Sequence, residues 1–142
     1  MPSTKKMVLK WLGNYRFTAI NENGLTVNFD APKQFRGEET ALSPMENVLA
    51  SLAACSSFHV TTILRKKRQQ LSDYSVEIEA QRRDEPPRIF TNIHIKYIIK
   101  GKNITKEAVE SSIRIAEEKY CSVGGMLKNT ARITSSYKII EE

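Results

Sequence analysis

The chain has 142 residues, of which 40% are hydrophobic and 27% charged. This length predicts one domain over residues 1–142, with a core large enough to fold without disulfide staples. No continuous apolar run approaches the roughly 18 residues of a membrane span, and the N-terminus lacks the apolar stretch of a signal peptide. We therefore expect a cytoplasmic protein with no membrane partner.

The charge balance is 22 basic against 16 acidic residues, a net charge of +6. Basic residues cluster at Lys5–Lys6, Arg65–Arg68 and Arg82–Arg83, but acidic residues are interleaved elsewhere. No nucleic-acid-binding motif accompanies these clusters, so we expect no nucleic-acid partner.

Residues 7–29 contain three short β-prone pieces, separated by Gly13-Asn14 and Asn23-Gly24. Both dipeptides are typical turn formers, so this region predicts a meander of small strands. Asn23-Gly24 is the stronger signal and predicts a two-residue type I′ turn, with positive φ at both positions. Residues 30–42 then form a loop.

A helix is predicted to begin after Ser43, because Ser43, Pro44 and Glu46 have the spacing of a capping box. Apolar residues follow at helical spacing as far as Leu64, and the basic run Arg65–Arg68 suits the negative end of the helix dipole. The middle of the helix consists almost entirely of small residues, which let other backbones approach closely. We therefore expect this helix to be central and covered on several sides.

The second half of the chain predicts two long strands, Tyr74 to Ala80 and Arg88 to Lys100, joined by a hairpin loop at 84–87. Thr105 caps a second helix that runs to Tyr120, and a last strand covers residues 131–140. Strands outnumber helices and mostly form hairpins. The pattern predicts an α+β fold with antiparallel sheet.

Cys55 lies in the first helix among small residues and has two interpretations. Most free cysteines are small buried hydrophobes. A nucleophilic cysteine instead needs a nearby cation or helix N-terminus, and His59, one turn later, is the only local candidate. Only His94 and Cys121 remain as further soft ligands, without the usual paired spacing, so we expect no metal site and no cofactor.

Cys121 follows the second helix, and its surroundings also leave two interpretations open. Residues 122–126 could begin a short helix whose backbone N–H groups stabilise a thiolate, or they could be a glycine-rich C-cap. The two cysteines are 66 residues apart (121 − 55), a separation that does not show whether their sulfurs meet.

An arginine near a thiol could bind an oxygen-bearing substrate and lower the pKa of the thiol. Arg16 lies between two apolar positions of an early strand. Each arginine taken alone is expected to be a solvated charge. The other candidates are Arg36, Arg82, Arg83 and Arg88.

The sequence resembles the OsmC/Ohr family of osmotically induced and organic-hydroperoxide-resistance proteins, over nearly its whole length. The resemblance rests on SPMENVLASLAAC (43–55) and EKYCSV (118–123), which are similar to the segments holding the two cysteines of the family. The tracts RRDEPPRIFTNI (82–93) and AEEKYCSVGGML (116–127) are closest to its YhfA-like branch.

The resemblance implies an OsmC-like fold with two long central helices and an intertwined homodimer, in which strands of both chains contribute to each sheet. It also implies a thiol peroxidase that reduces organic hydroperoxides in oxidative stress defence. Cys55 would attack the hydroperoxide and become sulfenic acid, and Cys121 would condense with it. A dithiol reductant, such as the lipoyl-type dithiols of the hydroperoxide-resistance branch, would reopen the disulfide, and Arg16 corresponds to the arginine of the active site.

The chain departs from the pattern of the family. Met45 stands where characterised members have the glutamate that pairs with the arginine, and Glu46 would point about 100° away around the helix. Ser122 replaces the usual proline after the second cysteine. These departures leave an alternative, an OsmC-like protein with little or no peroxidase activity that binds a small hydrophobic or acyl ligand in the dimer cleft or senses redox state.

Overall fold

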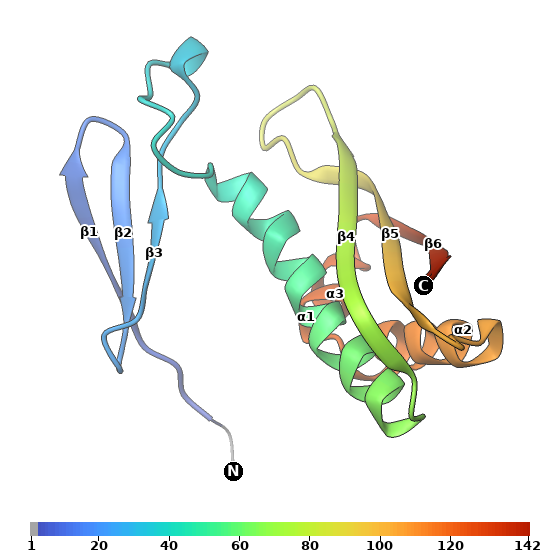
Figure 1. Ribbon diagram of the computed structural model, residues 1–142. Coiled ribbons are helices and arrows are strands. Elements are labelled where there is room, and N and C mark those ends of the chain that lie inside the picture. Colours follow the sequence, from blue (N-terminus) through green and yellow to red (C-terminus); the bar gives the residue numbers. More distant parts are fainter. Residues whose placement is uncertain (1–2) are drawn as a thin grey trace. The chain divides into compact units, whose positions relative to one another are not determined.

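The computed structural model describes residues 3–142 and divides the chain into two compact units, one ending at Val48 and the other comprising Leu49–Glu142 (Figure 1). Each unit has its own three-stranded sheet, with strand orders β1-β2-β3 and β4-β5-β6. The predicted α+β class is confirmed.

The N-terminal unit contains the predicted meander. Strands β1 (Met7–Gly13), β2 (Arg16–Asn21) and β3 (Thr26–Phe29) pair antiparallel in chain order. In this register Ala19 of β2 lies opposite Leu9 on one side and Val27 on the other. A short 3₁₀ turn, η1 (Lys33–Phe35), follows.

The turn between β2 and β3 corrects one sequence-based expectation. Gly24 has positive φ (81°), but Asn23 does not, so the two-residue type I′ turn is wrong. Instead, the Asn21 side-chain oxygen accepts the backbone N–H groups of Asn23 and Leu25, both at 2.9 Å. This local hydrogen bonding by an asparagine side chain favours a longer loop.

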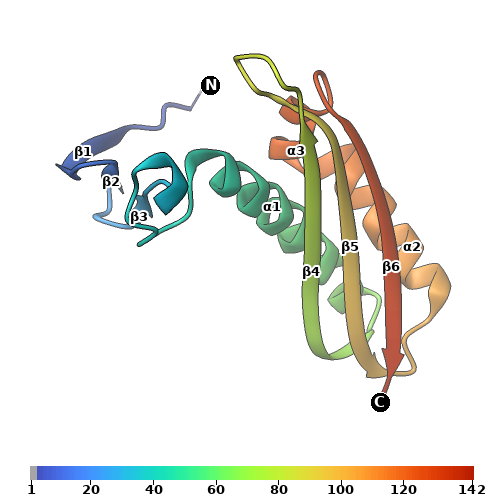
Figure 2. The same ribbon diagram turned by 90° about the horizontal axis from the view of Figure 1, so that it is seen from above.

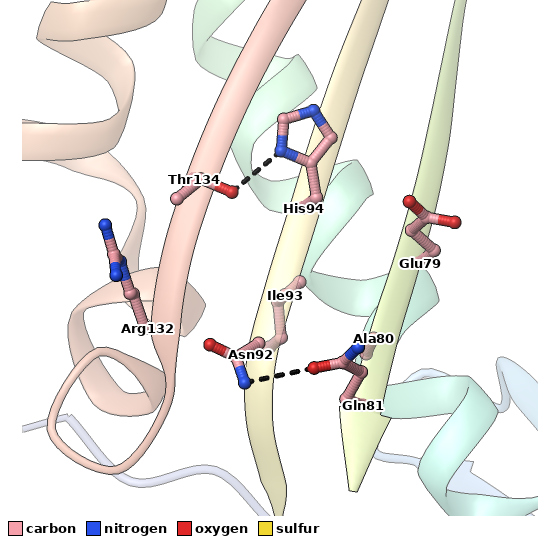
Figure 3. A pocket seen from close by; sticks show the side chains of 8 residues that line it. All are labelled: Glu79, Ala80, Gln81, Asn92, Ile93, His94, Arg132 and Thr134. Atoms are coloured by element: carbon pink, nitrogen blue, oxygen red, sulfur yellow. Dashed lines mark hydrogen bonds between the residues drawn. The ribbon is translucent and has the colours of Figure 1, made fainter.

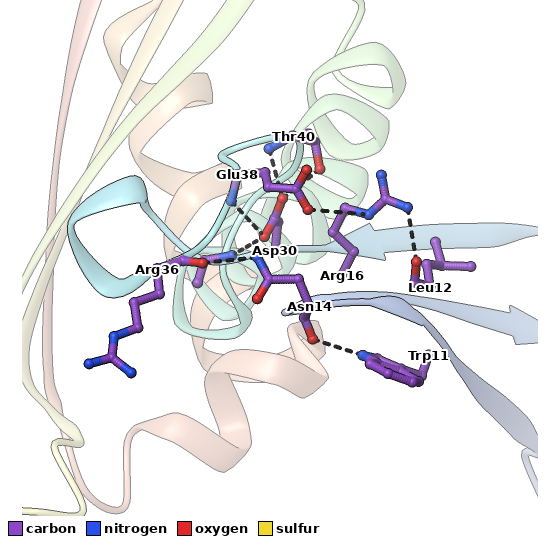
Figure 4. A network of polar contacts seen from close by, with 9 residues as sticks. Trp11, Leu12, Asn14, Arg16, Asp30, Arg36, Glu38 and Thr40 are labelled. Atoms are coloured by element: carbon purple, nitrogen blue, oxygen red, sulfur yellow. Dashed lines mark hydrogen bonds and ion pairs between the residues drawn. The ribbon is translucent and has the colours of Figure 1, made fainter.

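Asp30 organises the loop that follows β3 (Figure 4). Its side chain is only 1% exposed and accepts the Thr40 hydroxyl at 2.6 Å. The same carboxylate accepts backbone N–H groups from Ala31, Glu38 and Thr40. These hydrogen bonds, that of the Thr40 side chain first, hold the pKa of Asp30 well below its usual range against the opposing effect of desolvation.

Helix α1 (Pro44–Lys66) begins with the predicted capping box. The Glu46 N–H donates to the Ser43 hydroxyl at 3.3 Å, and the Ser43 N–H donates to the Glu46 carboxylate at 2.9 Å. Every fourth residue of one stripe is buried, namely Leu52, Ser56, Val60 and Leu64.

The rest of α1 is less covered than the sequence-based prediction of a central helix requires. Its length of 23 residues and the mean hydropathy of 1.4 of its most apolar 18-residue window would suit a membrane span, and only 22% of that window is buried. Core helices of soluble proteins meet the same two criteria, so this is weak evidence for a membrane.

The C-terminal unit is built on a sheet with β5 (Phe90–Lys102) in the middle (Figure 2). Strand β4 (Gln70–Arg82) pairs with it antiparallel, as predicted. Strand β6 (Arg132–Glu141) pairs with it in parallel, so the predicted antiparallel sheet is wrong for this pair of strands. The chain crosses over through the intervening helices, and such a connection permits parallel pairing.

The crossover consists of α2 (Lys106–Ile115), a π-helical turn η2 (Ala116–Tyr120) and the short helix α3 (Ser122–Leu127). Thr105 caps α2 as predicted, because its hydroxyl accepts the Ala108 N–H at 3.2 Å. Cys121 stands between η2 and α3. Of the two interpretations of the residues after Cys121, the short helix is confirmed.

Candidate thiol site

Cys121 is the N-cap of α3 and is 6% exposed. The Gly124 N–H donates to its sulfur at 3.3 Å. Burial raises the pKa of Cys121 to about 11, the Gly124 hydrogen bond opposes the increase, and neighbouring Cys55 and Glu117 add to it. Desolvation therefore outweighs the stabilisation that the helix N-terminus gives a thiolate.

Cys55 lies on α1, half-buried, and neither cysteine is in a disulfide. The Cys55 side chain lies near enough to the Cys121 thiol to contribute to the raised pKa of Cys121. The fold thus brings two of the predicted site residues together from helices far apart in the sequence.

Arg16, the third predicted site residue, lies on β2 of the N-terminal unit (Figure 4). Its Nη2 donates to the Leu12 carbonyl at 3.0 Å, and its Nε lies 3.8 Å from the Glu38 carboxylate. Within residues 3–142, this Nε is the one buried side-chain nitrogen or oxygen without a hydrogen-bond partner. The guanidinium therefore retains unused donor capacity.

The remaining candidate arginines serve local structure. Arg82 donates to the Arg88 carbonyl at 2.7 Å, Arg83 to the Pro87 carbonyl at 2.7 Å, and Arg88 to the Arg83 carbonyl at 3.3 Å. These three side chains therefore fasten the loop between β4 and β5. Arg36 is exposed, and its backbone oxygen accepts the Asn14 side chain at 2.9 Å.

A cavity of about 180 Å³ opens beside Cys121. Leucine and isoleucine side chains form much of its wall, whereas Glu117, Glu118 and Lys128 supply charge. The sequence-based search considered arginines as the cation and overlooked Lys128, which lies seven residues after Cys121. The complete lining is Leu52, Ser56, Ile95, Glu117, Glu118, Cys121, Gly124, Lys128 and Ile133.

The carboxylate of Glu117 is the centre of a hydrogen-bond network in this cavity. It accepts the Tyr97 hydroxyl at 2.7 Å and the Ser135 hydroxyl at 3.1 Å. The Tyr97 hydroxyl also bonds to Ser56 of α1, and burial, reinforced by Glu117, raises the pKa of Tyr97 far above its usual range. The tyrosine thus stays protonated and remains a donor to the carboxylate.

Sequence reasoning also missed Glu117. The residue is four positions before Cys121, which on a regular helix would place both on one face. The chain instead forms a π-helical turn, in which the Cys121 N–H donates to the Ala116 carbonyl at 2.8 Å. The four-residue spacing was therefore the signal that could have identified Glu117, although the turn is π-helical and not a regular α-helix.

The two histidines occupy different surroundings. The ring of His59 stacks on Tyr120, with 5.3 Å between ring centroids. His94 bonds to the hydroxyls of Thr134 at 2.7 Å and Ser136 at 2.9 Å. No group of three or more histidine, cysteine, aspartate or glutamate residues in the described part of the chain is arranged to hold a metal.

A larger, open pocket of about 400 Å³ contains His94 (Figure 3). Along β5, His94 alternates with the buried residues Ile93 and Ile95, so the pocket is on the face of the sheet opposite the core. It contains neither cysteine, so we place the candidate site at the smaller cavity.

The α+β fold, the two free cysteines and the partly apolar cavity beside Cys121 are the features expected of an OsmC-like protein. Residues 37–136 match the family model described as OsmC-like protein. Protein YhfA of Escherichia coli K12 is 35% identical over 132 residues, covering 93% of this chain and 96% of YhfA.

Two solved structures extend the comparison. A hypothetical protein from Aquifex aeolicus VF5 is 30% identical, with a TM-score of 0.86 and 99% of each chain covered. A Legionella pneumophila structure described as an organic hydroperoxide resistance protein OsmC has a TM-score of 0.71 at 19% identity, covering 96% of this chain and 99% of that one. The chain belongs to the OsmC-like family, as its resemblance predicted.

Proposed function

We propose that the protein is a thiol-dependent peroxidase that reduces organic hydroperoxides in oxidative stress defence. The observation that carries this proposal is the pairing of the free Cys55 and Cys121 side chains inside one unit of the fold. Family membership supports a peroxidase-related role, and the Legionella relative is described as an organic hydroperoxide resistance protein.

The proposed cycle has three balanced steps. The Cys55 thiol loses its proton and attacks the hydroperoxide as the thiolate, and the O–O bond breaks. The sulfur becomes sulfenic acid, and the leaving alkoxide takes up the proton to become an alcohol. Cys121 then attacks the sulfenic sulfur, forming a disulfide and releasing water. Finally, a dithiol such as a lipoyl group supplies two electrons and two protons, leaving both cysteines as thiols and becoming a disulfide itself.

The surroundings of the two sulfurs support the assignment of roles. Cys121 is buried and has a pKa of about 11, so its thiol is protonated at neutral pH and suits the later, resolving step. Cys55 is more exposed and is the better placed of the two to meet a hydroperoxide first. We also propose Arg16, which corresponds to the arginine of the active site in the family resemblance, as the cation that orients the hydroperoxide.

We further propose that the working form is a homodimer. Strand β1 exposes a run of large apolar side chains, and only four residues of α1 are fully buried within one chain. Exposed apolar surface of this extent is typical of an interface, and a second copy of the chain would cover it. A dithiol–disulfide cycle also requires reducing surroundings, so we place the protein in the cytoplasm. The exposed β1 side chains are Met7, Val8, Leu9, Trp11 and Leu12.

The test is to treat the reduced protein with one equivalent of cumene hydroperoxide and to map its cysteines by mass spectrometry. We expect a bridge between Cys55 and Cys121 in the wild type. Cys55→Ser should abolish turnover, whereas Cys121→Ser should retain sulfenic acid at position 55. Absence of any oxidation at Cys55 would refute the peroxidase, and equal activity of both variants would refute the assigned roles.

A second candidate, a protein that binds a small hydrophobic or acyl ligand, is favoured by two observations. Met45 replaces the carboxylate expected in the peroxide-activating pair, and the cavity beside Cys121 has apolar walls with a lysine in its lining. Titration with a fluorescent fatty acid discriminates the two candidates: saturable binding without hydroperoxide turnover supports the binding protein, and turnover without binding supports the peroxidase.

A further inference from the structure

Glu117 has no part in the cycle proposed above, yet its carboxylate lines the same cavity as Cys121. We infer that Glu117 is the proton acceptor for the Cys121 thiol during disulfide formation. The inference rests on the proposed peroxidase function and adds a residue to its second step.

The position of Glu117 is fixed by contacts on two sides. Tyr97 of the central strand donates to one of its oxygens at 2.7 Å, and Ser135 of β6 donates to the other at 3.1 Å. Each carboxylate oxygen has a second lone pair, so either oxygen can still accept a proton from a group in the cavity. The backbone bond from Cys121 to Ala116, the residue before Glu117, ties the thiol to the same turn.

The resolving step requires such an acceptor. Cys121 is protonated at neutral pH because burial raises its pKa to about 11, whereas the nucleophile in disulfide formation is the thiolate. As the S–S bond forms and the S–O bond of the Cys55 sulfenic acid breaks, the proton leaves Cys121 for Glu117, directly or through one water. It then joins the departing hydroxide, so the products are one disulfide and one water.

Other groups near the thiols fit this role less well. Lys128 also lines the cavity, but a charged ammonium has no lone pair to accept a proton. His59 stacks on Tyr120 and does not line the cavity. Glu118 lines it as an exposed residue without a hydrogen bond that fixes it, within the described residues. Glu117 combines a basic oxygen with a fixed position.

The decisive experiment follows a single turnover of Glu117→Gln, which keeps the size of the side chain and its acceptor oxygen but lacks carboxylate basicity. We expect Cys55 to be oxidised at the wild-type rate and the disulfide to form at least about tenfold more slowly, within the range of general-base effects. Sulfenic acid at Cys55 should therefore accumulate, measured by dimedone trapping and mass spectrometry in rapidly quenched samples.

Glu110→Gln is the matched control. Glu110 also accepts a tyrosine hydroxyl, from Tyr137 at 2.7 Å, but it is exposed and does not line the cavity beside Cys121. This variant should complete both steps at wild-type rates. Glu117→Asp should recover part of the lost rate, and acetate should accelerate disulfide formation in Glu117→Ala.

The outcomes separate this inference from the proposed function. Absence of Cys55 oxidation in the wild type removes the peroxidase itself. Normal oxidation followed by equally fast disulfide formation in Glu117→Gln overturns only the role of Glu117. A Glu117→Gln variant slowed equally in both steps, without acetate rescue of Glu117→Ala, also overturns it, because that pattern indicates a structural role.

Discussion

The two sheets of the molecule differ in how many of their apolar side chains are buried. Strand β5 alternates, with Ile93, Ile95, Tyr97 and Ile99 each at most 1% exposed. In the strands of the N-terminal sheet, all of them within the described residues, Ala19 is the single buried side chain, although five of the seven residues of β1 are apolar. Apolar content alone therefore does not determine burial.

The reason for the difference is the layer that covers each sheet. The Tyr97 hydroxyl contacts Ser56 of α1 and Glu117 of η2, so helices of the same unit cover one face of the C-terminal sheet. The N-terminal unit has only a short 3₁₀ turn and the first residues of α1 besides its strands. Both thiols lie in the unit that completes its own core, and Arg16 lies in the unit that does not.

The largest expected effect tests whether Leu64 is part of a packed core in the C-terminal unit. Leu64 is 0% exposed, so Leu64→Ala should lower the free energy of unfolding by about 2–5 kcal/mol through lost contacts and a cavity. Met126 is 76% exposed, and Met126→Ala should change it by no more than about 0.5 kcal/mol. Urea denaturation measures both, and equal effects would contradict a core at Leu64.

The next effect concerns the exposed strand β1. Leu9 is 59% exposed in one chain, and in the proposed dimer a second copy covers it. Leu9→Lys should weaken association at least about tenfold, equivalent to about 1.4 kcal/mol, because a charge would be buried without a partner. Sedimentation equilibrium measures this change. The control Ser75→Lys, at an exposed position of β4, should leave association unchanged; equal effects would argue against an interface at β1.

Much of the secondary structure could be predicted from the sequence, because its signals are local. The capping box at Ser43 and the Thr105 cap depend on residues three positions apart, and both are present. The parallel pairing of β6 could not be predicted, since strand direction depends on the path of the crossover. An excess of strands over helices, from which antiparallel sheet was predicted, does not determine the direction of an individual strand.

The candidate site was only partly predictable for the same reason. The two cysteines could be recognised by their sequence contexts, but their approach depends on how α1 and α3 pack. Glu117 and Lys128 join the site through the cavity. Glu117 lies in the tract 116–127 that contains Cys121, but the resemblance gave it no role, and Lys128 lies outside that tract. Burial determines the direction in which the pKa of Cys121 changes, and burial is a tertiary property.

A smaller effect should distinguish the units by pH. The lowered pKa of Asp30 stabilises the N-terminal unit fully above the unfolded-state value of about 3.9, and this stability is lost as the pH falls toward the folded-state pKa. Asp30→Asn should therefore lower the melting temperature at pH 7 and flatten its dependence on pH in the acid range. Fluorescence of Trp11, the single tryptophan, reports on this unit.

The control for this prediction is Asp73→Asn, at an exposed position of β4 in the other unit. This variant should retain the wild-type pH dependence of Trp11 fluorescence. The assignment of the acid response to Asp30 would be wrong if Asp30→Asn still showed the full loss of stability below about pH 4.

The smallest effect concerns the thiol in the well-covered unit. Burial, more than the charges of Cys55 and Glu117, raises the pKa of Cys121 to about 11. Removing the charge with Glu117→Gln should lower the pKa of Cys121 while leaving it above the ordinary value of about 8.5, because the desolvation remains. Alkylation rates measured against pH in a Cys55→Ser background give this pKa. A value in the ordinary range for the unmodified Glu117 protein would show that solvent reaches the sulfur, and the contrast in burial between the two sheets would then not extend to the site.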